Sequence, residues 1–181
     1  MSATVAIART GARHEGHELL AATIASPSGL RMRVLDLGGI IWSLHVPDAH
    51  GGLRDVVLGH DDPAAYLADP YYLGAITGRC AGRIADARFV LDGEEHRLTA
   101  NAGRHHLHGG TRGFNAVRWA MAPTPDGVRL TYVSPDGEEG YPGTLEARVE
   151  YALTDDGAVE VRYEAVVDRA TPVNLTQHSY F

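Results

Sequence analysis

Two neighbouring segments, residues 145–153 and 159–167, alternate between apolar and mostly charged residues, and this pattern limits the fold more than any other feature. A period of two puts every second side chain on the same face of a β-strand. The turn sequence Asp-Asp-Gly at 155–157 lies between the segments. The pattern predicts two antiparallel strands, each with one buried face and one face in water. The side chains expected to be buried are Leu145, Ala147, Val149, Tyr151 and Leu153, and Val159, Val161, Tyr163, Ala165 and Val167.

Turn sequences divide most of the remaining chain into short strands as well. Pro-Asp-Gly occurs at 125–127 and at 135–137, and the apolar segments around these turns predict a β-meander that continues into the two strands above. Asp92 and Gly93 lie between two alternating segments and predict a tight hairpin, whose turn positions need positive φ angles. Three short apolar runs near the start predict successive antiparallel strands at residues 18–26, 30–39 and 40–48.

The only helical signal is at residues 63–68, where Asp62 can cap the first turn and Pro63 suits its first position. The length of 181 residues and the apolar fraction of 44% fit one globular domain, and no repeat or linker interrupts it. We therefore expect an all-β fold, a sandwich or an open barrel. Because the sequence stops on the apolar Phe181 and domain ends are usually polar, we expect residues 1–181 to be the N-terminal part of a longer sandwich.

The composition excludes several functions. All 16 basic residues are Arg, so Schiff-base chemistry and a lysine-bearing phosphate loop have no residue to use. The net charge of −7 and the lack of a basic run argue against nucleic acid or an anionic membrane as partner and favour a small neutral or polar ligand. Cys80 is the only cysteine, which excludes an internal disulfide and a multi-cysteine zinc site. With no signal peptide and no long apolar run, the sequence predicts a soluble, cytoplasmic protein.

The candidate chemistry lies in the histidines, and residues 101–110 hold three of the ten between glycines. A metal site is the first alternative, because His106 and His108 have the spacing that puts two imidazoles on one side of a strand. A metal motif of that kind needs a carboxylate a few residues later, and Arg112 stands near that position. We therefore predict that His105, His106 and His108 bind no metal tightly.

Nucleophilic catalysis is the second alternative. Ser179 directly follows His178, so on a strand the two side chains would point to opposite faces, and no nucleophile elbow occurs. The charge of Arg79 beside Cys80 would lower the pKa of the thiol, but no pattern places a histidine beside it. What remains is general acid and base catalysis by two histidines, with arginines as donors to oxygen atoms and aromatic faces for a neutral polyol. These candidates are His108 and His178, Arg79 and Arg83, and Trp42, Phe114, Tyr141 and Tyr180.

Five motifs in register resemble those of the aldose 1-epimerases, the galactose mutarotases. They are Gly-Arg-Cys-Ala-Gly-Arg-Ile at 78–84, Phe-x-Leu-Asp-Gly at 89–93, the histidine segment at 101–110, Gly-Phe at 113–114 and Asn-Leu-Thr-Gln-His-Ser-Tyr-Phe at 174–181. The resemblance implies a large antiparallel β-sandwich and the interconversion of the α and β anomers of a free hexose, glucose or galactose, through ring opening, without a cofactor.

The same resemblance assigns site residues. It makes His178 the general acid that protonates the ring oxygen, His108 a hydrogen-bonding partner of the same sugar and Arg83 the substrate-binding arginine. Gly82 takes the place of an asparagine that is common in the family, and Ser179 and Tyr180 would line the site beside His178. The family's general base is a glutamate in its C-terminal half, beyond these residues, and neither Glu138 nor Glu139 lies in a motif that would replace it.

Three interpretations follow from the incomplete catalytic set. The chain is part of an aldose 1-epimerase whose base lies elsewhere, or a non-catalytic carbohydrate-binding or regulatory module of the same fold, or a fragment that is stable only with its missing half. A sandwich cut after Phe181 would expose strand edges and apolar faces, so self-association or pairing with a C-terminal segment is expected. The sequence does not choose between the aldoses.

Overall fold

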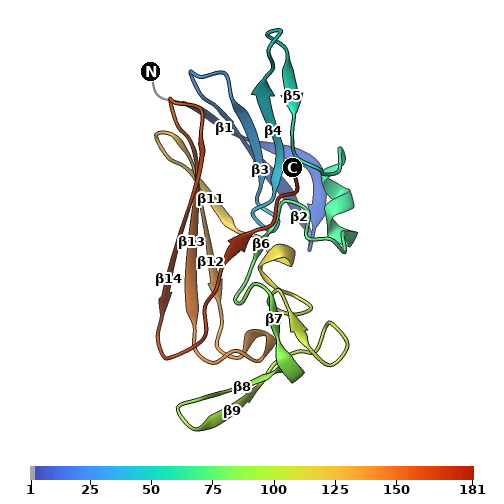
Figure 1. The fold of residues 1–181 in the computed structure, drawn as a ribbon, viewed down its shortest axis with the longest axis vertical. Helices are drawn as coiled ribbons and strands as arrows, with labels where there is room; N and C mark the ends of the chain where they lie inside the picture. The colour runs from blue at the N-terminus through green and yellow to red at the C-terminus, as the bar shows by residue number, and fades with distance from the viewer. Residues whose placement is uncertain (1–2) are drawn as a thin grey trace.

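The computed structural model describes residues 3–181, whose main strands form two antiparallel sheets (Figure 1). The first sheet has the strand order β1-β2-β3-β4-β5 and the second the order β11-β12-β13-β14. The strands of the first sheet are β1 (Thr4–His14), β2 (His17–Ala25), β3 (Arg31–Leu35), β4 (Ile41–Pro47) and β5 (Leu53–Asp55). Those of the second are β11 (Ala120–Pro123), β12 (Gly127–Ser134), β13 (Leu145–Leu153) and β14 (Val159–Val167).

The three strands predicted near the start of the chain are β2, β3 and β4, and each pairs with the next. The strand β1 was not predicted. Its side chains are at most half-buried, and its register with β2 shifts between Arg9 and Arg13, around Gly11 at a φ of 85°. An irregular strand at the edge of a sheet carries little apolar alternation, so its sequence gives no clear period of two.

The predicted meander is confirmed, with continuous antiparallel pairing from β11 to β14. On β13 the predicted buried face is also confirmed, because every second residue from Leu145 to Leu153 is buried. On β14 the corresponding prediction is wrong: Tyr163 is 38% and Val167 is 39% exposed. The reason is that only the start of β14 reaches the core: Val159 and Val161 pack against the core cluster, whereas Tyr163, Ala165 and Val167 lie outside it.

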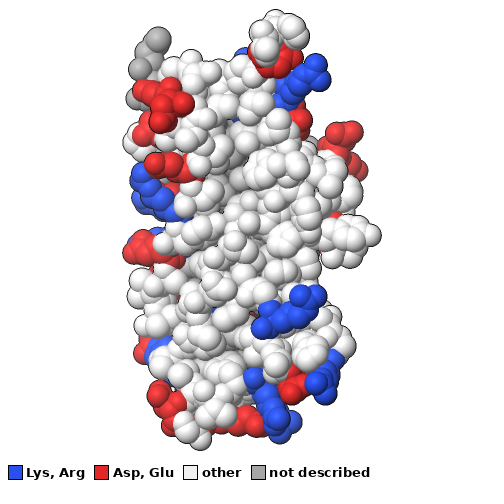
Figure 2. Space-filling view, in the orientation of Figure 1, with Lys and Arg blue, Asp and Glu red and all other residues white. Residues whose placement is uncertain are grey.

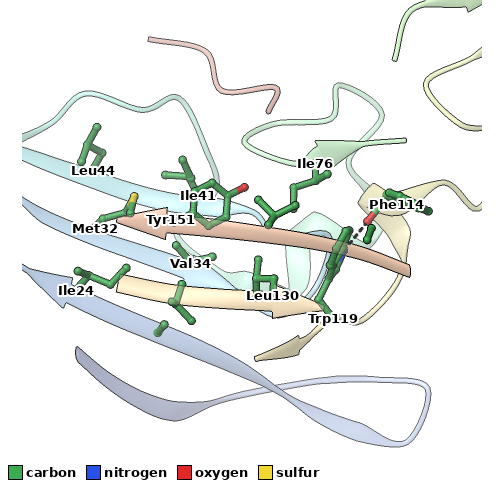
Figure 3. Packing of buried hydrophobic residues seen from close by; sticks show 14 of the residues in the cluster. Ile24, Met32, Val34, Ile41, Leu44, Ile76, Phe114, Trp119, Leu130 and Tyr151 are labelled. Carbon is green, nitrogen blue, oxygen red and sulfur yellow. Dashed lines mark hydrogen bonds between the residues drawn. The ribbon is translucent and has the colours of Figure 1, made fainter. Parts of the chain in front are cut away.

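The hydrophobic core lies between the two sheets (Figure 3). Leu130 of β12 and Tyr151 of β13 pack there against Met32 and Val34 of β3. The Tyr151 hydroxyl donates to the Gly39 carbonyl oxygen at 2.8 Å, which satisfies the one polar atom of this ring inside the core. The second sheet is therefore fixed against the turn that connects β3 to β4.

Shorter elements lie between the two sheets and, in the view of Figure 1, below them. The pairs are β6 (Ile76–Thr77) with β15 (Thr176–Gln177), β7 (Arg83–Ile84) with β10 (His106–Leu107), and β8 (Arg88–Leu91) with β9 (Glu94–Arg97). The predicted hairpin is confirmed, because Asp92 and Gly93 have φ angles of 50° and 85° between β8 and β9. The 3₁₀ helices are η1 (Pro63–Ala68), which is the predicted helical turn capped by Asp62, η2 (Ala85–Ala87), η3 (Phe114–Ala116) and η4 (Glu138–Gly140).

Charged side chains are dispersed on the face shown in Figure 2, where blue and red atoms lie mostly near the margins around an uncharged centre. Inside the fold, Asp36 is an exception, because its carboxylate is buried. It accepts from Leu20 N at 2.9 Å and forms an ion pair with Arg118, 2.7 Å between Oδ2 and Nη2. No helix within residues 3–181 is long and apolar enough to cross a membrane.

Candidate active site

The backbone around His178 is held by the pairing of β15 with β6. His178 N donates to the Ala75 carbonyl oxygen at 2.8 Å, and Gly74 N donates to the His178 carbonyl oxygen at 3.1 Å. The Gln177 side-chain amide donates to the Gly74 carbonyl oxygen at 2.6 Å. The segment 174–178, far away in sequence, is therefore attached to residues 74–81, and His178 is positioned by strand-like hydrogen bonds.

His108 follows β10 and comes to the same place through a tight turn. It has a φ of 53°, and its N–H donates to the Gly82 carbonyl oxygen at 3.0 Å. The next residue, Gly109, has a φ of 95°, and a Cβ there would overlap the Gly78 carbonyl oxygen. Asn101 fixes the turn, because its side chain accepts from Leu107 N and donates to the carbonyl oxygens of Leu107 and Gly110.

The two imidazoles lie beside each other at nearly right angles, with ring centroids 5.1 Å apart and an interplanar angle of 85°. Gly82 N donates to His108 Nδ1 at 3.1 Å. Because Nδ1 accepts this bond, the neutral His108 ring carries its proton on Nε2 and presents an N–H donor. Burial lowers the pKa of His108, and the nearby His178 and Arg83 lower it further, so this ring stays neutral at physiological pH.

Two tyrosines complete this cluster. Tyr180 was predicted to lie in the site, and its ring centroid is 5.1 Å from that of His178, with 42% of the residue exposed. Tyr72 was not predicted. Its ring centroid lies 4.8 Å from that of His108 and 5.9 Å from that of His178. No local pattern marks Tyr72, because it lies in an irregular segment and its proximity follows from the β6–β15 pairing.

The other predicted binding residues lie around the two histidines in different ways. Arg83 is exposed on β7, opposite Leu107, and forms no ion pair or hydrogen bond through its side chain with residues 3–181. Gly82 acts through its backbone on His108, and a Cβ at Gly82 would meet open space. The Ser179 hydroxyl is buried and has no hydrogen-bond partner within the described residues.

Four other candidates are corrected by the structure. Arg79 is buried. Its guanidinium donates to the Ser134 hydroxyl at 2.8 Å and to the carbonyl oxygens of Ser134, Pro135 and Pro142. These hydrogen bonds stabilise the turn after β12, so Arg79 has a structural role. Phe114 and Tyr141 are each 1% exposed and offer no face to a ligand. Burial raises the pKa of the Cys80 thiol, which is the reverse of the lowered pKa considered from its arginine neighbour. For a fifth candidate, Trp42, the role of an aromatic binding face stays a prediction: the residue is half-buried, and the guanidinium carbon of Arg33 lies 3.5 Å from its ring centroid.

The three clustered histidines do not converge. His106 is buried, with Nδ1 at 2.7 Å from the Thr99 carbonyl oxygen and Nε2 at 2.7 Å from the Tyr141 hydroxyl. His105 Nδ1 accepts from Asp86 N at 3.1 Å, whereas His108 Nδ1 accepts from Gly82 N. His108 leaves the strand with a positive φ, so the alternate spacing does not put the two rings on one side. The lack of tight metal binding stays a prediction.

Within residues 3–181, no carboxylate oxygen lies within 4 Å of a ring nitrogen of His108 or His178. The carboxylates of the two candidate glutamates have other partners. Glu139 accepts from the backbone N–H groups of Thr111 and Arg112, and Glu138 accepts from the Tyr132 hydroxyl at 2.6 Å and from the Ser134 hydroxyl. The cluster thus holds one imidazole fixed as a neutral donor, a second imidazole and a free guanidinium, without an acidic side chain among the described residues.

Comparisons of sequence place this arrangement among known proteins. The family model for aldose 1-epimerase matches residues 21–181. Galactose mutarotase of Bos taurus is 48% identical over 152 residues, which cover 84% of this chain and 44% of that protein. Aldose 1-epimerase of Escherichia coli strain K12 is 39% identical over 160 residues, which cover 88% of this chain and 46% of that protein.

Comparisons with solved structures point to the same family as the comparisons of sequence. A crystal structure of galactose 1-epimerase from Lactobacillus acidophilus NCFM superposes with a TM-score of 0.86 at 28% identity, covering 99% of this chain and 53% of that one. A GalM/aldose epimerase homologue from C. elegans gives a TM-score of 0.82 at 30% identity, covering 86% and 48%. The predicted fold class, an all-β sandwich of this type, is confirmed. The chain spans about half the length of the relatives that it matches.

Proposed function

The chain belongs to the aldose 1-epimerase family, and from this we propose that it supplies the acid side of an active site that interconverts the α and β anomers of a free aldohexose, glucose or galactose. The observation that carries the proposal is the pair of perpendicular imidazoles, His108 and His178, with ring centroids 5.1 Å apart. Arg83 lies near His108, and its side chain has no partner among residues 3–181. General acid catalysis needs a group that holds a proton near neutral pH, and imidazole suits that role.

In this proposal His178 gives its proton to the ring oxygen of the sugar. A base removes the proton of the anomeric hydroxyl, the bond between C1 and the ring oxygen breaks, and the open aldehyde forms. Rotation about the C1–C2 bond presents the other face of the carbonyl, and the same groups act in reverse to close the ring. No proton or electron is gained or lost over the cycle, so the chemistry calls for no redox partner.

His108, Arg83 and the neighbouring residues bind the sugar in this proposal. The neutral His108 donates from Nε2–H to a sugar oxygen, because Gly82 N already occupies Nδ1. Arg83 donates to hydroxyl oxygens, and its lack of a protein partner within residues 3–181 leaves its guanidinium free to do so. Ser179 and Tyr180 follow His178 directly and line the same site.

The base in this proposal is a carboxylate from outside residues 3–181. The support is that no carboxylate within those residues lies near either imidazole, while the family uses a glutamate from its C-terminal half. Relatives of about twice this length have room for that half. We infer that the same complementary segment covers the exposed side of β14, where Tyr163 and Val167 face water, and that residues 1–181 on their own self-associate.

The test is polarimetry of freshly dissolved α-D-galactose and α-D-glucose with the complete protein, in which residues 1–181 are joined to the segment that supplies the base, and with two variants of it. We expect His178→Asn to remove nearly all acceleration, a loss of about 10² to 10⁴ in kcat, and to weaken sugar binding only modestly. His50→Asn, at an exposed turn, is the matched control and keeps the parent rate. A His178→Asn protein that accelerates mutarotation as well as the control removes the assignment, and sugar binding without any interconversion by the parent protein favours a carbohydrate-binding module.

A further inference from the structure

Tyr72 lies in a segment that is shaped by hydrogen bonds rather than by regular structure. The side chain of Asp69 accepts from Tyr71 N at 3.2 Å and from Leu73 N at 2.8 Å, and so holds the backbone on both sides of Tyr72. Ala75 N donates to the Tyr72 carbonyl oxygen at 3.1 Å and closes a turn. Gly74 and Ala75, two and three residues after Tyr72, form hydrogen bonds with the backbone of His178.

The backbone of Tyr72 adopts a conformation that a bulky residue avoids. Its φ is 58°, in the left-handed region where a tyrosine side chain crowds its own backbone. Such a backbone conformation is strained and persists only where the surrounding structure enforces it. The turn made by Asp69 and Ala75 does so here, and its result is that the ring of Tyr72 reaches both imidazoles.

The ring rather than the hydroxyl makes these contacts. The interplanar angle between the rings is 63° for Tyr72 with His108 and 43° for Tyr72 with His178. The Tyr72 hydroxyl forms no hydrogen bond with any of residues 3–181, and burial raises its pKa. A neutral ring with an unpartnered hydroxyl has one evident effect on its neighbours, which is to fill space beside them and exclude water.

We propose that the ring of Tyr72 is a positioning residue, which holds the two imidazoles at right angles and keeps water away from His108. This inference rests on the proposed function, since it concerns the same histidines. It assigns no role to the Tyr72 hydroxyl. The ring acts on the reaction through His108 and His178 and does not exchange a proton itself.

The groups that face these histidines determine what removal of the ring should do. His108 faces Arg83, His178, Tyr72 and the N–H of Gly82, and His178 faces His108, Tyr72 and Tyr180. Water admitted beside His108 would reduce the cost of charging it, so its pKa would rise toward the usual value. A protonated His108 would repel a protonated His178, and its ring would no longer be the neutral donor. As the pH falls, activity would therefore be lost at a higher pH than in the parent.

The experiment compares Tyr72→Leu with Tyr72→Phe in the same protein. Tyr72→Phe retains the ring, and we expect its kcat, KM and pH profile to match the parent. Tyr72→Leu should lower kcat about 10- to 100-fold, because small misplacements of reacting groups cost about this much, with little change in KM. The acidic limb of its kcat/KM profile should move to higher pH, and nuclear magnetic resonance titration without sugar should show a raised His108 pKa.

Tyr71→Leu is the matched control, since Tyr71 is adjacent in sequence but 65% exposed, and it should leave the kinetics and the His108 titration unchanged. A Tyr72→Phe variant with a raised KM or a reduced kcat would show that the hydroxyl contacts the sugar and would overturn the assignment to the ring. A Tyr72→Leu variant that is folded, with the parent titration of His108, would overturn it as well. If the complete protein, with the segment that supplies the base, has no epimerase activity, the proposed function fails, and the titration still tests the positioning role.

Discussion

The second sheet and the candidate active site differ in how regular their backbones are. The second sheet is centred on two long strands, β12 and β13, whose inward side chains are buried in the core between the sheets, and its hydrogen bonds run in continuous ladders. The candidate active site consists of two-residue strands and turns, and His108 and Tyr72 both have positive φ angles. The difference indicates that the sandwich provides stability, whereas the irregular segments provide the chemical groups and their orientation.

The largest effect should come from the core of the second sheet. Leu130→Ala removes a side chain that is fully buried between the sheets, so we expect a loss of about 2–5 kcal/mol in the free energy of unfolding. Val133→Ala lies on the same strand but is 54% exposed, and it should change that free energy by less than about 0.5 kcal/mol. Urea unfolding measures both. Equal effects of the two substitutions would contradict the packing described here.

Substitutions of His106 and His108 should affect different properties, the first the free energy of unfolding and the second the activity. His106→Ala leaves the buried Tyr141 hydroxyl and Thr99 carbonyl oxygen without a partner, at a cost of about 1–3 kcal/mol in unfolding free energy. Its folded form should still interconvert anomers. His108→Ala loses one hydrogen bond, from Gly82 N, and should cost less stability while it removes most of the activity. Urea unfolding and polarimetry of the two variants test this, and the reverse outcome would show that the roles are misassigned.

The smallest effect concerns Gly82, where the family often has asparagine. Gly82→Asn places a side chain in open space at a φ of 79°, a region that asparagine tolerates better than most residues. One added hydrogen bond to a sugar hydroxyl should lower KM about 2- to 10-fold. Gly93→Asn at the hairpin turn has similar backbone geometry and open space, and it should leave KM unchanged. A KM that does not fall in Gly82→Asn would place this position outside the sugar-binding surface.

The regular part of the fold was predictable because its signals are local. The meander, the hairpin at Asp92 and Gly93 and the capped turn at 63–68 all depend on residues close together in sequence. The alternation in β14 is the same as in β13, so the pattern alone predicts a buried face, and only the expectation of an incomplete sandwich predicted exposed apolar faces. A sequence period indicates which side chains share a face, but it does not indicate whether another layer covers that face.

The candidate site divides in the same way. His108, His178, Arg83 and Tyr180 came from motifs with distinctive residues and spacing. Tyr72 was not predicted from the sequence, because its place beside the histidines depends on the pairing of residues 74–75 with residue 178, about a hundred positions later. Arg79, Phe114 and Tyr141 have suitable chemistry, but the fold buries them. Residue type alone does not distinguish a binding group from a core group.

The most direct test of the central claim is a sugar titration of the protein with labelled histidines, followed by nuclear magnetic resonance. If the two perpendicular imidazoles form the sugar site, D-galactose should shift the ring signals of His108 and His178, while those of His106 and the exposed His50 stay in place. Shifts at other histidines with none at His108 or His178, or no shift at saturating sugar in a protein that interconverts anomers, would contradict the account.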